Sequence, residues 1–157
     1  MKRLTPALLL APLMMVACQP ASTGDEEAPV GPVLSYEDAF IQAPLAGRDV
    51  TMGGIRISVE GGDVTLTGAT TDAAASVETH TMSMEDGTMK MRPVEGWQIR
   101  DGETLILERG GDHLMFFGVD ETLSPGDRTD ITLYFDTPGR EEPLTLVAEA
   151  EVRSIGE

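Results

Sequence analysis

Hydrophobic and polar residues alternate along most of the chain after residue 35, a pattern typical of β-strands with one buried face. Residues 130–136 show it clearly, with Ile131, Leu133 and Phe135 at every second position. The same reasoning predicts eight further strands, which cover residues 36–43, 55–59, 64–68, 77–84, 89–94, 103–108, 113–118 and 144–152. No segment has a convincing helical period, so the pattern predicts an all-β chain.

Turn-forming residues separate these segments, and the strands recur about every 11 residues. About nine short strands at this spacing favour a Greek-key β-sandwich or barrel in a single domain. Gly61-Gly62 predicts a tight hairpin in which Val59 faces Val64 across two antiparallel strands. Residues 70–75, which are small and polar, are expected to form a loop.

A second hairpin is predicted at Asp86-Gly87, because both residues tolerate the positive φ angles of a two-residue turn. This register pairs Met84 with Met89, and Met82 with Met91. Side chains two residues apart on a strand share a face, so His80 lies on the face of these methionines. By the same rule His113 and Met115 point together, and Leu114 between them points to the core.

Methionine and histidine are concentrated in this part of the chain. Both histidines, and five of the six methionines outside the leader, lie within residues 80–115. A hydrophobic core uses methionine sparingly, so packing does not account for the cluster. Thioether sulfur and neutral imidazole are ligands that suit Cu(I). Zinc favours Cys, His or carboxylate, and calcium and magnesium favour oxygen, so the residue types point to copper.

The spacing His80–x10–Met91–x21–His113–x–Met115 resembles the signature of the PCuAC family of periplasmic copper chaperones. The flanking residues, including Gly110-Gly111-Asp112 before His113, are similar too, and the likeness covers about residues 35–152. The resemblance implies a cupredoxin-like β-barrel that binds one Cu(I) through these two His and two Met. It also implies transfer of the ion to cytochrome c oxidase subunit II or a Sco-type protein during oxidase assembly.

Other residues of this region are given weaker roles. Met82 is a possible auxiliary ligand, since it lies opposite Met91 in the predicted register. Met84 and Met89 are expected to form a soft apolar surface on which a partner docks. Met52 is expected in the core or a loop, and Trp97 in the packing or as a shield for the metal. No residue is assigned a catalytic role, because two histidines engaged with metal cannot supply a triad.

The N-terminus carries the features of a bacterial lipoprotein leader. Residues 1–17 contain a basic start and a short apolar stretch, as in a signal peptide. The sequence before Cys18 resembles a lipobox, so Cys18 is the expected site of lipidation. Residues 18–34, rich in Pro, Gly and acidic side chains, are expected to be a disordered tether. The copper-binding domain is expected to span residues 35–153, facing the periplasm.

Charge and composition narrow the functions further. The formal net charge of −16 disfavours nucleic acid and anionic membrane surfaces, so the lipid is the only membrane contact expected. Cys18 is the one cysteine, and without another thiolate a blue-copper electron carrier is disfavoured. An envelope copper buffer or resistance lipoprotein stays open as an alternative, as does a lipoprotein that uses its methionines only for docking. Because imidazole must be unprotonated to bind metal, Cu(I) affinity is expected to fall below roughly pH 6.

Overall fold

The computed structural model describes residues 31–155, which form ten β-strands. No helix is present among these residues, and so none could cross a membrane. The strands are β1 (Val33–Gln42), β2 (Val50–Glu60), β3 (Val64–Thr71), β4 (Ala74–Glu85), β5 (Thr88–Pro93), β6 (Trp97–Ile99), β7 (Thr104–Leu107), β8 (His113–Val119), β9 (Arg128–Asp136) and β10 (Leu144–Arg153). The prediction of an all-β chain is therefore confirmed, with one strand more than expected.

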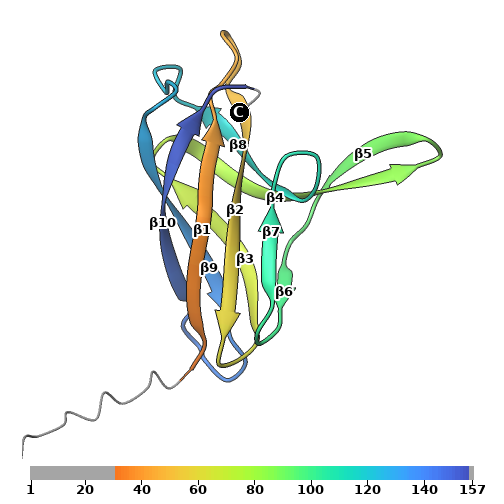
Figure 1. The fold of residues 1–157 in the computed structure, drawn as a ribbon, viewed down its shortest axis with the longest axis vertical. Coiled ribbons are helices and arrows are strands. Elements are labelled where there is room, and N and C mark those ends of the chain that lie inside the picture. Colours follow the sequence, from red (N-terminus) through yellow and green to blue (C-terminus); the bar gives the residue numbers. More distant parts are fainter. Residues whose placement is uncertain (1–30, 156–157) are drawn as a thin grey trace, which may run out of the picture.

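Seven of the strands close into a barrel (Figure 1). Their order around it is β4-β8-β2-β1-β10-β9-β3, and a β3–β4 pairing at Ala69 and Val77 completes the ring. All of these pairings are antiparallel except β1 with β10. The remaining strands attach at the sides: β5 to β4, β6 to β3, and β7 to β2. Strands adjacent in space are thus often distant in sequence, as crossover connections require.

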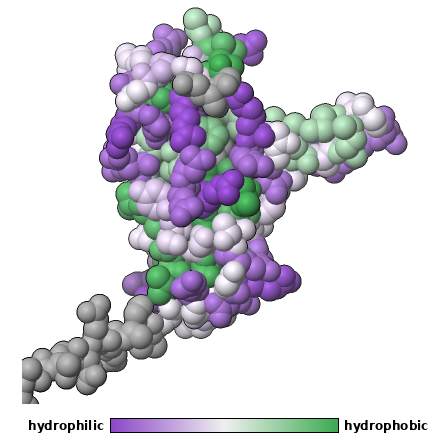
Figure 2. Space-filling view, viewed as in Figure 1, coloured by the Kyte–Doolittle hydropathy of each residue, from purple (hydrophilic) through white to green (hydrophobic). Residues whose placement is uncertain are grey.

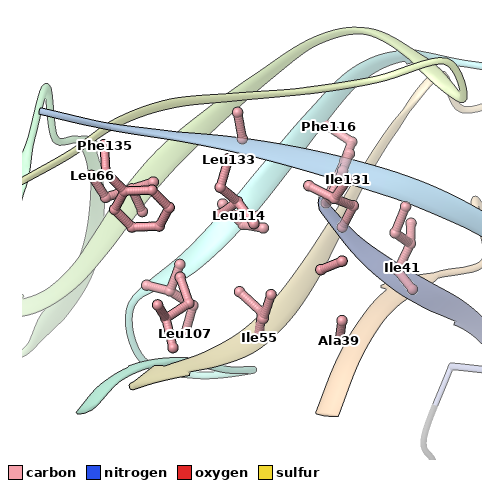
Figure 3. Close-up of a cluster of buried hydrophobic side chains, with 14 of the residues drawn as sticks. Ala39, Ile41, Ile55, Leu66, Leu107, Leu114, Phe116, Ile131, Leu133 and Phe135 are labelled. Atoms are coloured by element: carbon pink, nitrogen blue, oxygen red, sulfur yellow. The ribbon is translucent and has the colours of Figure 1, made fainter. Parts of the chain in front are cut away.

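The barrel interior is filled by the alternating apolar residues (Figure 3). Ile131, Leu133 and Phe135 of β9 are completely buried, as the alternation predicts. On β8, Leu114 and Phe116 are also completely buried. His113 and Met115 alternate with them and therefore lie on the outer face of the barrel wall. The same alternation that builds the core thus places the candidate ligands outside it.

The predicted hairpin at Gly61-Gly62 is wrong. β2 pairs with β1, β7 and β8, whereas β3 pairs with β4, β6 and β9, so Val59 and Val64 are not cross-strand partners. Both valines are nevertheless buried, because the chain crosses from one side of the barrel to the other at this turn. An apolar alternation predicts which side chains point inward, and it does not distinguish a hairpin from a crossing between opposite walls.

Other features of the strand assignment also differ from expectation. Residues 70–75 are mostly strand, because β3 runs to Thr71, β4 begins at Ala74, and two residues suffice for the turn. β6 was not predicted, since three residues are too few to show a periodicity. β1 begins at Val33, so its first two residues fall within the segment predicted as tether.

A two-stranded arm projects from the barrel (Figure 1). It consists of the second half of β4 and all of β5, joined at Asp86-Gly87. Both turn residues have positive φ, 50° and 76°, as the predicted two-residue turn requires. The register is also as predicted, with Met84 opposite Met89. Figure 2 shows this arm standing away from the barrel with a moderately hydrophobic surface along it.

Candidate metal centre

The two histidines meet where β4 leaves the barrel. Before this point β4 pairs with β8, and beyond it with β5. His80 lies at the change of partner: it is opposite His113 on one side and Pro93 on the other. The imidazole rings of His80 and His113 have centroids 5.9 Å apart, and the two residues are only 8% and 3% exposed. Two histidines 33 positions apart in sequence thus become direct neighbours.

Each imidazole has one nitrogen engaged by an acceptor. Nδ1 of His113 donates to the backbone carbonyl of Gly111 over 2.9 Å. Nε2 of His80 donates to Oε2 of Glu78 over 2.9 Å. Because a carbonyl or carboxylate oxygen only accepts, these contacts leave the lone pair on Nε2 of His113 and on Nδ1 of His80. Nδ1 of His80 is buried and has no hydrogen-bond partner, which is the condition of a nitrogen available to a metal ion.

Thioethers gather beside His113 around a cavity of about 300 Å³. Met82 and Met91, which face each other across β4 and β5, line it from the arm. Met115 lines it from β8. His80 does not line the cavity itself, but its ring is the neighbour of His113. The structure therefore brings together all four residues of the spacing motif, together with Met82.

A further methionine, Met52, was missed as a site residue. It was expected in the core or a loop, but it lies on β2 directly opposite Met115 of β8 and lines the same cavity. In the sequence, only its identity as a methionine could have indicated a role. Its position beside Met115 results from the pairing of β2 with β8, which joins residues more than 60 positions apart. The remainder of the cavity wall comes from the end of β1, the segment after it, the start of β2, the loop before β8 and the segment after β10: Gln42, Ala43, Leu45, Val50, Thr51, Gly110 and Ile155.

Three residues that were given weaker roles, Met84, Met89 and Trp97, do not line the cavity. Met84 and Met89 share the face of Met82 and Met91 but sit closer to the turn, outside the cavity wall, and are 65% and 48% exposed. Trp97 is on β6, pairs with Leu66 and packs against the barrel core. It is absent from the cavity wall, so packing rather than shielding describes its position.

The donor set of this cavity is soft. Its walls offer four thioether sulfurs and one imidazole, with a second imidazole adjacent. Within residues 31–155, no group of three or more His, Cys, Asp or Glu gathers in a way that could hold a metal ion. Soft thioethers with neutral imidazoles are suited to Cu(I), whose coordination needs no thiolate or carboxylate.

Comparison with known proteins assigns the family. The model of the family described as "Putative lipoprotein LpqE-like" matches residues 34–147, most of the chain. This protein belongs to the LpqE-like family. A curated relative, "Putative lipoprotein Lxx21020" of Leifsonia xyli subsp. xyli (strain CTCB07), is 29% identical over 109 residues. The match covers 69% of this chain and 64% of that relative, so the chain spans less than two thirds of the relative's length.

Solved structures, among them a PCuAC domain, have the same fold. The copper-bound PCuAC domain from PmoF2 superposes with a TM-score of 0.61 at 16% identity, over 77% of this chain and 92% of that domain. The solution structure of CuI-DR1885 from Deinococcus radiodurans gives a TM-score of 0.55 at 28% identity, over 86% of this chain and 85% of that one. The predicted cupredoxin-like barrel and the resemblance to PCuAC domains are therefore confirmed.

Proposed function

We propose that this LpqE-like protein is a copper chaperone of the cell envelope that carries one Cu(I) through His80, Met91, His113 and Met115. The observation that carries the proposal is that Met91, His113 and Met115 line one cavity, and that His80, whose buried Nδ1 has no hydrogen-bond partner, lies beside His113. The copper named in the description of CuI-DR1885, which is 28% identical to this chain, agrees with that donor set.

The protein presents both imidazoles in fixed orientations. His113 is held by the Gly111 carbonyl and His80 by the Glu78 carboxylate, which fix the ring orientations before metal arrives. Thioethers are neutral and lose no proton on binding. Met82 and Met52 line the same cavity and provide spare sulfurs for an ion that changes ligands.

Release of Cu(I) is proposed to proceed by ligand exchange at the exposed side of the site. Met91 is 46% exposed, whereas both histidines are buried. An acceptor thioether, thiolate or imidazole therefore reaches the ion from the arm side, where Met91 leaves as the new bond forms. Copper remains Cu(I) throughout, so the step requires no electron donor.

The acceptor and the location are further parts of the proposal. The PCuAC resemblance favours delivery to cytochrome c oxidase subunit II or a Sco-type protein, with an envelope copper buffer as the alternative. The predicted lipidation at Cys18 and the leader lie outside the described residues, and the LpqE-like description as a lipoprotein supports them. An anchored domain on a tether facing the periplasm would meet such acceptors at the membrane.

Competition for Cu(I) with a chromophoric chelator tests the metal site. We expect one tight equivalent in the unaltered protein, and a loss of affinity of roughly 10-fold or more in His113→Ala and Met91→Leu, since each removes one donor. Met91→Leu keeps the side chain apolar and of similar volume, so it removes little besides the sulfur.

Val147→Ala provides the matched control. Val147 is an exposed apolar residue of β10, a strand that does not border the site, and its loss should leave the Cu(I) affinity unchanged. Failure of the unaltered protein to compete with the chelator would refute the chaperone proposal. Equal affinity of Met91→Leu and the unaltered protein would remove Met91 from the ligand set.

A further inference from the structure

The tip of the arm carries a pair of methionines that the proposed site does not use. Met84 and Met89 are direct cross-strand partners, each separated from the Asp86-Gly87 turn by one residue. They are 65% and 48% exposed, so both side chains are accessible to solvent. Every residue of β5 is exposed, so this pair does not stabilise the barrel by packing.

The two thioethers are placed to hold one ion between them. Directly opposed residues on antiparallel strands have Cβ atoms about 4.5–5.5 Å apart. Methionine is unbranched and has three rotatable bonds, so both sulfurs can turn toward a common point. The turn keeps the partners in register, because Asp86 and Gly87 both adopt positive φ. Two neutral, soft sulfurs form a ligand pair for Cu(I).

Charged groups of the arm are kept off this face. Lys90 Nζ lies 2.9 Å from Oε2 of Glu85, and the guanidinium of Arg92 lies 2.8 Å from the same carboxylate. Lys90 and Arg92 alternate with the methionines of β5, so they occupy the opposite face. The basic groups are therefore paired with a carboxylate on the opposite face, and Lys90 and Arg92 do not share the face of Met84 and Met89.

We propose that Met84 and Met89 form a second, weaker Cu(I) site through which the ion enters or leaves the inner site. The next pair on the same face, Met82 with Met91, lies about 7 Å away along the strands and lines the inner cavity. In the step, bonds from copper to the outer sulfurs break as bonds to Met82 and Met91 form, and neither a proton nor an electron moves. The existence of the outer site does not depend on the proposed function. Only the passage of the ion between the outer and the inner site rests on the proposed function.

The test is a titration of the full chain with Cu(I), followed through the methyl resonances of its methionines. We expect the first equivalent to shift the methyls of Met91 and Met115, and the second to shift those of Met84 and Met89. In M84L/M89L the second equivalent should be lost and the first retained. In His113→Ala, which damages the inner site alone, the response of Met84 and Met89 should persist.

A matched control alters the other face of the same arm. S83A/K90R changes a cross-strand pair between the two methionine pairs, keeps the charge, and should leave both equivalents in place. The proposal is overturned if no second equivalent shifts Met84 and Met89, or if that equivalent survives in M84L/M89L. If the proposed inner site fails, the result is different: in the unaltered protein, Cu(I) would shift only the methyl resonances of Met84 and Met89.

Discussion

At the residue scale, the site depends on where alternation places each side chain. Alternation and the Asp86-Gly87 turn predicted which side chains share a face, and the resemblance to the PCuAC spacing selected four of them as ligands: His80, Met91, His113 and Met115. The hydrogen bonds that orient the imidazoles could not be predicted in this way. Whether Gly111 reaches His113, for example, depends on the path of the loop before β8.

Met52 shows the limit of such reasoning. Its position opposite Met115 results from the pairing of β2 with β8, which no local pattern encodes. The family spacing includes only residues from 80 onward, so it gave no indication either. A residue that joins a site through long-range strand pairing is found only once the barrel is assembled.

The contact between Glu78 and His80 yields a prediction at this scale. Glu78→Ala removes the carboxylate that receives Nε2–H of His80, so the ring loses its orientation and some basicity. We expect the affinity for Cu(I) to fall roughly 10-fold, since loss of such a supporting contact typically costs 10- to 100-fold. Chelator competition measures the change.

Glu103→Ala is the control for Glu78→Ala, because it removes another half-exposed carboxylate, from the turn before β7. Both variants lose one negative charge, so a general electrostatic effect would lower both affinities equally. That outcome would contradict a specific role for Glu78, whereas a decrease confined to Glu78→Ala would support it.

At the element scale, we expect substitutions in the arm to lower the stability of the protein less than substitutions in the barrel wall. The arm is attached to the barrel through β4, and its strand β5 is exposed throughout. β8, by contrast, lies in the barrel wall between β4 and β2. The hydrophobic pattern predicted β5 and β8 as strands, but it did not predict that β5 is exposed and β8 lies inside the barrel wall. Such a pattern shows which strands are amphipathic, and it does not show which strands have a neighbour on both sides.

Two glycines with positive φ test this difference. Gly118 of β8 has φ +64°, and a Cβ there would come within 2.7 Å of Ala75 Cβ, whereas at Gly87 (φ +76°) a Cβ would meet no atom within 4 Å. Gly87→Ala should therefore cost about 1 kcal/mol of strain in the arm. Gly118→Ala adds a clash in the barrel wall and should lower the free energy of unfolding by ~2 kcal/mol or more. Urea unfolding compares them, and an equal or larger loss for Gly87→Ala would contradict this view of the arm.

At the scale of the whole molecule, fold class was predictable and topology was not. The all-β architecture follows from nine recognised alternating segments. The closure of the barrel by β3 and β4, and the separation of β2 from β3, depend on which distant strands pair. The wrong hairpin at Gly61-Gly62 shows the reason: Val59 and Val64 are buried equally well in either arrangement, so burial alone does not choose between them.

The same topology explains how one short chain builds the proposed site. β4 contributes to the barrel and to the arm, and His80 lies where its two roles meet. β8 brings His113 and Met115 beside it, and the arm returns with Met91. The proposed ligands therefore come from the barrel wall on one side and from the long, half-exposed side chain of Met91 on the arm on the other, an arrangement suited to both holding and releasing an ion.

Above all, we propose that the thioethers of this cavity and the imidazoles of His113 and the adjacent His80 together hold one Cu(I). The most direct measurement is copper K-edge X-ray absorption of the protein loaded with one equivalent of Cu(I). We predict a first shell that contains both sulfur and imidazole nitrogen, with the sulfur contribution reduced in Met91→Leu and the imidazole contribution reduced in His113→Ala. A shell of nitrogen and oxygen alone, or a spectrum unchanged in both variants, would contradict the account.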